Sequence, residues 1–298
     1  MELKKATRKQ VKLRLGLSAV AGGGKTKGAL LLAKGLCGDW SKIAVVDTEN
    51  NSASLYSDMG DFNTLELSAD YTPEKYNAAI KTCESAGMEV IIIDSITHEW
   101  DGKGGIIDIS NSMTGNSFTN WAKITPRHQA FIDAILQSKC HIITTVRRKQ
   151  DYEMSKDNNG KTVVTKAGLK EVTREGFEYE LTLNFNLDEK HNCTASKDRT
   201  GLFMDKPAFV ITEETGKTIR DWCELGINPE EEARKAAEQL VKDKKPLIKD
   251  MKAILLNSLF TDEERTKWFE YFDNPLTGLH AMEKARVRME ELLEQRQK

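Results

Sequence analysis

The feature that most constrains this chain is a glycine-rich run, Ala19-Val-Ala-Gly-Gly-Gly-Lys-Thr26. It follows the spacing Gly-x-x-x-x-Gly-Lys-Thr, with alanine at the first position, where glycine is usual. Alternating apolar residues precede it between positions 11 and 17, and an amphipathic helical pattern follows it to Leu36. A glycine-rich turn between a strand and a helix is typical of a phosphate-binding loop, so the run predicts an α/β fold that holds a nucleotide.

Each residue type in this run has its own chemical role. The glycines let the backbone curl so that successive N–H groups point at phosphate oxygens, and the helix start adds the positive end of its dipole. Lys25 is expected to reach the β- and γ-phosphates of ATP, and the Thr26 hydroxyl is expected to bind Mg²⁺. The predicted nucleotide-contacting residues are Ala19, Gly22, Gly23, Gly24, Lys25, Thr26 and Lys27.

Acidic residues end two apolar segments farther along the chain. The segment Val90–Asp94 is a buried strand by composition, and Asp94 at its end is expected to hold Mg²⁺. The segment Ile43–Asp47 is followed by Glu49, 24 residues after Lys25. Because residues at the carboxyl edge of a parallel sheet face the ligand crevice, Glu49 is expected to face the bound nucleotide. The other interpretation is that Asp47 and Glu49 are ordinary solvated acids.

Alternation of strands and helices along the first half predicts a parallel sheet with right-handed crossovers. A strand is expected at residues 140–146, followed by a polar stretch with a hairpin turn at Asn158-Asn159-Gly160. An antiparallel strand is expected over 181–187, with neighbours at 191–197 and 208–212. The predicted fold is therefore α/β, with a mainly parallel sheet flanked by helices and extended by antiparallel strands.

Helix signals divide the chain into two predicted domains, an ATPase domain over residues 1–225 and a helical region over 226–298. Thr72-Pro73 and Thr125-Pro126 each predict a helix start, as does Asn228-Pro229 in the second domain. Pro246 is expected to interrupt the helix that follows. Thr261 and Glu264 have the spacing of a capping box.

The position of Glu49 resembles that in RecA-type ATPases, where the general base follows the strand after the P-loop helix. This resemblance implies that Glu49 is the base that activates the attacking water. In many other P-loop ATPases the base follows the Walker B aspartate directly, but here Ser95 follows Asp94. Over residues 11–223 the chain looks like the small RecA-like ATPases of bacteriophage recombination modules. That resemblance rests also on Arg174-Glu-Gly-Phe-Glu-Tyr-Glu180 and Lys197-Asp-Arg-Thr-Gly201. It implies a RecA-like core and ATP hydrolysis with Mg²⁺.

The resemblance also implies roles for residues later in the chain. The strand around His141–Val146 looks like the one that ends in a polar sensor, for which Thr145 is the first choice and Thr144 the second. Lys197 and Arg199 resemble the Lys-x-Arg element with which hexameric RecA-like helicases reach the γ-phosphate of a neighbouring subunit. The alternatives are β-branched packing for the threonines and a basic turn for the Lys-x-Arg element.

Local charge suggests where nucleic acid would bind, although the net charge is only −2. Residues 139–174 hold nine Lys and Arg against four acids, and residues 1–14 hold six against one. Two segments match the DNA-binding loops of RecA-like proteins: residues 101–120, with Phe118 and Trp121 as stacking groups, and residues 149–174. The other interpretation is a solvated basic face. The candidate contacts are Arg147, Arg148, Lys149, Lys161, Lys166 and Lys170.

The favoured function is an ATPase that acts on single-stranded DNA in phage recombination, repair or replication. It is expected to assemble as a ring or filament and to work with a single-strand-binding or recombination protein. A hexameric helicase or helicase loader is one alternative, and a nucleotide-switched binding module with vestigial hydrolysis is another. The chain has no apolar run long enough for a membrane span and five scattered cysteines. A cytoplasmic location is therefore expected, in a bacterial host if a phage encodes the protein.

Overall fold

The computed structural model describes residues 3, 5–156, 162–274 and 277–298. The chain forms two compact units: residues 10–225, and residues 1–9 together with 226–298. Each unit has its own apolar core.

None of the helices in the described part of the chain has the length and apolar character needed to cross a membrane.

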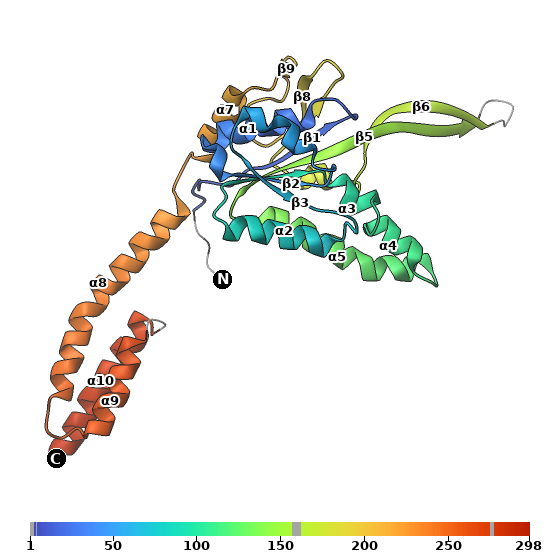
Figure 1. The fold of residues 1–298 in the computed structure, drawn as a ribbon. Coiled ribbons are helices and arrows are strands. Elements are labelled where there is room, and N and C mark those ends of the chain that lie inside the picture. Colours follow the sequence, from blue (N-terminus) through green and yellow to red (C-terminus); the bar gives the residue numbers. More distant parts are fainter. Residues whose placement is uncertain (1–2, 4, 157–161, 275–276) are drawn as a thin grey trace. The chain divides into compact units, whose positions relative to one another are not determined.

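A mixed sheet organises the unit of residues 10–225 (Figure 1). Its strands lie in the order β3-β2-β4-β5-β1-β7-β8-β9, parallel from β3 to β7 and antiparallel from β7 to β9. This arrangement confirms the predicted α/β fold class, with a mainly parallel sheet extended by antiparallel strands. The strands are β1 (Arg14–Ala19), β2 (Ile43–Asp47), β3 (Asn63–Glu66), β4 (Val90–Asp94), β5 (His141–Lys156), β7 (Leu183–Leu187), β8 (Asn192–Asp198) and β9 (Phe209–Val210).

Helices cover both faces of this sheet, which explains why its central strands are apolar along their whole length. Val90 and Ile92 of β4 pack in the cluster that contains α1 (Lys25–Cys37) and α7 (Glu213–Cys223). Ile91 and Ile93 pack on the other face, against α2 (Pro73–Ser85) and α5 (Ser117–Gln137). The two helical layers lie on opposite sides of the strands in Figure 1. Shorter helical segments are η1 (Trp40–Lys42), η2 (Ser52–Met59), α3 (Thr97–Asp101), α4 (Ile106–Ser112) and α6 (Phe177–Glu180).

Two glycines allow α1 and α7 to approach each other closely. A Cβ atom on Gly35 of α1 would lie 2.1 Å from the carbonyl oxygen of Glu213 and 2.7 Å from Cα of Gly216. A Cβ atom on Gly216 of α7 would lie 2.4 Å from the carbonyl oxygen of Leu32. Both contacts are too short for a side chain, so backbone packs directly on backbone where these helices cross.

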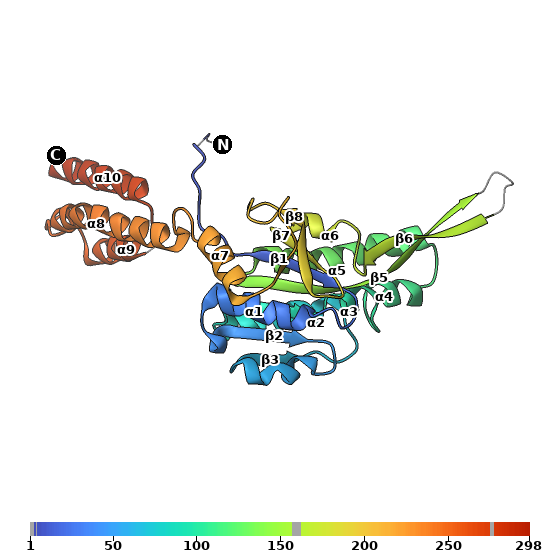
Figure 2. The same cartoon turned by 90° about the horizontal axis from the view of Figure 1, so that it is seen from above.

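Strand β5 continues beyond the sheet and forms a two-stranded arm with β6 (Thr162–Glu171) (Figures 1 and 2). Residues 142–147 of β5 pair with β1, whereas residues 148–156 pair with β6 alone. The polar segment 149–174 is therefore an ordered antiparallel ribbon over most of its described length. The hairpin turn predicted at Asn158-Asn159-Gly160 lies outside the described residues.

Several sequence predictions about elements were wrong. Strand β7 pairs antiparallel with β8 as predicted, but it is also parallel to β1, and β9 pairs with β8 rather than with β7. Helix α5 begins at Ser117 rather than at Thr125, because the Asn116 side chain accepts a hydrogen bond from the Phe118 N–H and caps an earlier start. The supposed loop 101–120 is consequently helical for much of its length.

The second unit is built from α8 (Pro229–Leu255), α9 (Asp262–Asp273) and α10 (Leu279–Gln297). The helix start at Pro229 and the capping box of Thr261 and Glu264 are confirmed. Pro246 lies inside α8 and does not end it, contrary to the prediction. Methionines and aromatic residues form the core, including Met251, Phe260, Phe272, Met282 and Met289.

Candidate functional site

The glycine-rich run forms a tight loop between β1 and α1. Gly22 and Gly24 have φ values of 77° and 81°, a left-handed conformation that glycine adopts without a steric penalty. The Lys25 ammonium folds back over the loop and donates to the carbonyl oxygens of Val20 at 3.2 Å and Ala19 at 3.5 Å. Burial lowers the pKa of Lys25, while the nearby Asp94 carboxylate acts in the opposite direction.

Asp94 lies beside the loop and links two threonine hydroxyls. Thr26 Oγ1 donates to Asp94 Oδ2 at 2.5 Å, and Thr145 Oγ1 donates to Asp94 Oδ1 at 2.5 Å. Thr144 faces elsewhere and donates to the carbonyl oxygen of Leu15, so of the two sensor candidates Thr145 is the one beside Asp94. A hydroxyl and a carboxylate meeting at the end of the P-loop suit Mg²⁺, which prefers oxygen ligands; Thr26 and Asp94 are the residues that would hold it.

Glu49 is positioned by the turn that follows β2. Asp47, buried at the end of this strand, accepts from the N–H groups of Glu49 at 2.7 Å and Ala53 at 2.8 Å. Strands β2 and β4 pair so that Asp47 lies opposite Asp94. The turn therefore brings Glu49 to the same edge of the sheet as the predicted Mg²⁺ ligands.

The carboxylate of Glu49 accepts three hydrogen bonds from neighbouring side chains. Ser95 Oγ donates to Glu49 Oε1 at 3.0 Å. Arg147 donates from Nε to the same oxygen at 2.9 Å and from Nη2 to Oε2. Arg147 was predicted to contact nucleic acid, but its guanidinium lies at this site in a bidentate ion pair.

A match to a protein-family model supports the assignment of this site to a nucleotide-binding domain. A family described as "AAA domain" matches residues 11–210, more than half of the chain. This chain belongs to the AAA-domain family. Among solved structures, it is similar to a KaiC-like protein from the hyperthermophilic archaeon Pyrococcus horikoshii, with 16% sequence identity and a TM-score of 0.40. That match covers 67% of this chain and 87% of the other. No curated protein matches the chain.

The AAA domain has a cavity of about 530 Å³ beside the P-loop, a size suited to a small-molecule ligand. Gly22 and the residues from Gly24 to Gly28 form its phosphate end. Its other walls were not found by sequence reasoning, because they come from segments distant in sequence. These lining residues are Leu31, Tyr56, Leu187, His191, Val210 and Ile211.

His191 closes over the P-loop of the AAA domain from the turn between β7 and β8. Its ring packs so near Gly24 that a Cβ atom there would lie 2.8 Å from Nδ1 of His191. The turn is held by Asp188, whose side chain accepts from the N–H groups of Lys190 at 2.9 Å and Asn192 at 2.7 Å. Glycine is thus required at position 24 for two reasons. The backbone there has a positive φ, and a side chain would collide with the ring of His191.

The predicted Lys-x-Arg element lies at the end of β8. Lys197 Nζ and Arg199 Nη2 both donate to the carbonyl oxygen of Tyr179 in α6, the latter at 3.1 Å. Burial and the neighbouring Arg199 lower the pKa of Lys197. Neither side chain is among the residues that line the nucleotide cavity of its own AAA domain.

The other basic candidates are distributed along the arm. Arg148 donates to the carbonyl oxygen of Leu169 across the ribbon at 2.9 Å. Lys149 pairs with Asp101 at 2.8 Å, and Lys170 pairs with Glu175 at 3.4 Å. Lys166 is exposed, and Lys161 lies outside the described residues.

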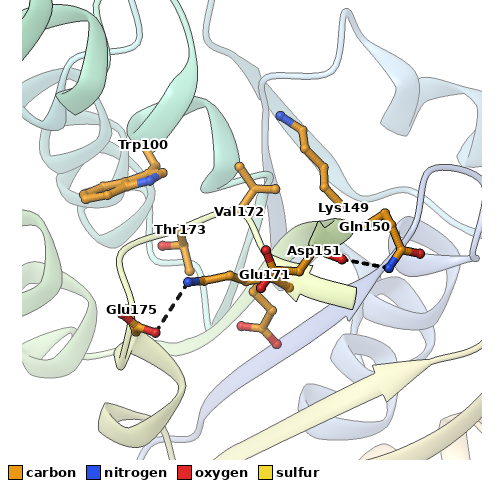
Figure 3. Close-up of a pocket in the computed structure, with 9 residues that line it drawn as sticks. Trp100, Lys149, Gln150, Asp151, Glu171, Val172, Thr173 and Glu175 are labelled. Atoms are coloured by element: carbon orange, nitrogen blue, oxygen red, sulfur yellow. Dashed lines mark hydrogen bonds and ion pairs between the residues drawn. The ribbon is translucent and has the colours of Figure 1, made fainter. Parts of the chain in front are cut away.

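A cavity of about 360 Å³ opens where the arm leaves the AAA domain (Figure 3). Trp100 forms an aromatic wall and also packs on Trp121, with ring centroids 6.0 Å apart. Trp121 is therefore half-buried behind Trp100, whereas Phe118, the other predicted stacking residue, is 84% exposed. The polar lining comes from the arm and from the segment after it: Lys149, Gln150, Asp151, Lys170, Glu171, Thr173 and Glu175.

Proposed function

We propose that this protein hydrolyses ATP and couples hydrolysis to single-stranded DNA bound along the β5–β6 arm, in phage recombination, repair or replication. The observation that carries the hydrolytic part is the meeting of Lys25, Thr26, Asp94 and Glu49 at one edge of the sheet. Belonging to the AAA-domain family supports nucleotide binding there.

Each of these groups has a task that its position allows. The loop amides and Lys25 bind and orient the triphosphate, with the Lys25 ammonium near the terminal phosphate. Glu49, once its carboxylate is free, accepts a proton from the attacking water. When bound by Thr26 and Asp94, Mg²⁺ would neutralise charge on the phosphoryl oxygens.

The DNA-binding part of the proposal is supported by the arm. In its described part, the ribbon carries three exposed lysines that can contact phosphates, with Lys149 and Lys170 opposite each other near its base and Lys166 farther out. Trp100 at its base offers a surface on which a nucleobase can stack. Phosphate contacts of this kind make binding weaken steeply as salt concentration rises.

Assembly as a ring or filament is part of the same proposal. Lys197 and Arg199 are not among the residues that line the nucleotide cavity of their own subunit, as expected of residues that act on a neighbour's nucleotide. This placement supports assembly without fixing the number of subunits.

The test is the ATPase rate, measured against protein concentration with and without a homopolymeric single-stranded oligonucleotide. We expect turnover to rise with both. The Lys25→Ala variant controls for contaminating ATPases. Absence of stimulation, together with no retention of the oligonucleotide at low salt, would reject the DNA-binding part. Unwinding of a forked duplex would instead favour the helicase alternative.

A further inference from the structure

Strand β5 connects the nucleotide site with the arm through a single continuous stretch of backbone. Residues two apart on a strand point to the same face. On one face of β5, three successive side chains each contact an acidic residue: Thr145 with Asp94, Arg147 with Glu49, and Lys149 with Asp101. The same strand therefore reaches the predicted Mg²⁺ ligand, the predicted base and the start of the arm.

The state of Glu49 in this arrangement is unsuited to proton abstraction. Its two carboxylate oxygens accept three hydrogen bonds, two from Arg147 and one from Ser95. A general base needs a lone pair directed at the water that it deprotonates. Together with the Ser95 hydroxyl, the bidentate guanidinium takes up three of the roughly four lone pairs of the carboxylate in a fixed geometry, so Glu49 is a poor base while Arg147 holds it.

Arg147 is placed where it can exchange partners. Its side chain is 39% exposed, whereas that of Glu49 is 18% exposed. Its neighbours in sequence, Arg148 and Lys149, begin the stretch of β5 that pairs only with β6. Phosphates that run along the arm therefore come within reach of the guanidinium, and phosphate binds arginine by the same bidentate geometry as carboxylate.

We propose that Arg147 is a positioning residue that keeps Glu49 inactive until a single-stranded polynucleotide on the arm competes for its guanidinium. This inference rests on the proposed function and adds its regulation. Arg147 performs no chemistry on ATP, and it sets how often Glu49 is free to act.

The backbone around Arg147 is fixed, so the exchange concerns its side chain alone. The Arg147 N–H donates to Thr97 Oγ1 at 2.9 Å, and its carbonyl oxygen accepts from the Val172 N–H at 2.8 Å. Its Cα also lies in register with Ala19 of the P-loop strand. Replacing the side chain should therefore leave β5 in place.

The decisive variant is Arg147→Ala, assayed with Mg-ATP in the full-length protein. DNA-free kcat should rise about tenfold, because releasing a charge-assisted hydrogen bond to Glu49 restores the free carboxylate. The KM for ATP should be unchanged, and single-stranded oligonucleotide should add little further stimulation. In the double variant Glu49→Gln/Arg147→Ala the increase in DNA-free kcat should vanish, since that increase depends on the Glu49 carboxylate.

The matched control is Arg127→Ala. Arg127 makes a bidentate pair with Glu74 at 2.7 and 2.8 Å on the surface of α5, away from the nucleotide site. This change removes the same charge and the same kind of ion pair, and both the DNA-free rate and the stimulation should remain those of the wild type. If Arg147→Ala fails to fold by circular dichroism, Arg147→Gln, which keeps much of the side-chain length, tests the same point.

Two results would overturn the inference: a DNA-free rate for Arg147→Ala at or below that of the wild type, or DNA stimulation of the variant by the same factor as the wild type. Both leave the proposed function standing. Absence of hydrolysis from the wild type and the variant alike would instead reject the proposed ATPase itself.

Discussion

At the scale of single residues, the site depends on side chains that meet from distant parts of the chain. Thr26 and Asp94 are 68 positions apart, and Glu49 and Arg147 are 98 apart. The sequence identified the members of the P-loop because their spacing is local. It could not reveal that Arg147 pairs with Glu49, because no local sequence pattern shows which strand ends lie close together.

Replacing Glu49 by glutamine should separate binding from hydrolysis. The amide cannot accept the proton of the attacking water, so turnover should fall by about 10²-fold or more while ATP still binds. Fluorescent-nucleotide titration and a phosphate-release assay measure the two properties. Lys25→Ala is the contrasting variant, in which ATP affinity itself should be lost. Near-normal turnover in Glu49→Gln would place the base elsewhere.

His141 should make the stability of the protein depend on pH. Its Nδ1 accepts a hydrogen bond from the Leu13 N–H at 3.1 Å, which requires the neutral ring, and burial lowers its pKa to about 3 from 6.5. Below pH 6.5 the unfolded chain therefore binds a proton that the folded chain does not. Stability should fall by about 2 kcal/mol between pH 6.5 and pH 5 from this group alone.

Urea unfolding at pH 7.5 and pH 5 tests that expectation. In His141→Asn the side-chain oxygen can accept from Leu13 without titrating, so the variant should lose less stability on acidification than the wild type. An equal loss in both proteins would show that other groups, such as the buried Glu99–His128 pair, govern the response.

At the scale of elements, the sequence predicted features that depend on neighbouring residues, such as helix starts, and missed features that depend on distant ones, such as strand pairing. The helix starts at Pro73 and Pro229 and the strand Val90–Asp94 are confirmed, since caps and apolar runs are local. The antiparallel pairing of β7 with β8 is confirmed, but the parallel pairing of β7 with β1 was missed, because it depends on the arrangement of the whole sheet. Pro126 was taken as a helix start, but a helix capped upstream at Asn116 tolerates it in its interior.

The crossing of α1 and α7 gives a prediction for packing. Gly35→Ala should destabilise the ATPase unit by about 1–3 kcal/mol, because the added methyl group meets the backbone of α7. Thermal unfolding measures the change. Gly28→Ala is the control, since Gly28 lies in the same helix and its added Cβ would meet only side-chain atoms, at 3.4 Å or more, and it should change the unfolding much less. Equal effects would mean that the helices can move apart freely.

At the scale of the whole molecule, the proposed assembly places part of each site on a neighbouring subunit. Arg199→Ala should still bind ATP but should lose the part of its rate that rises with protein concentration, on the order of 10³-fold if it acts as an arginine finger. Mixing this variant with Lys25→Ala subunits should restore some activity, because each supplies what the other lacks. No recovery at any mixing ratio would argue that Arg199 serves only its own subunit.

The place of β1 in the sheet has a consequence for biosynthesis. This first strand lies between β5 and β7, which come much later in the chain. On the ribosome the phosphate-binding residues emerge long before either flanking strand, by on the order of 10–30 s at ordinary translation speeds. The cavity beside the P-loop is also completed late, since Leu187, His191, Val210 and Ile211 line it. Until β5 has emerged, β1 is an apolar strand without a sheet partner, and its other edge stays unpaired until β7 has been made. Exposed strand edges favour aggregation, so this is the interval in which a chaperone would protect the chain most.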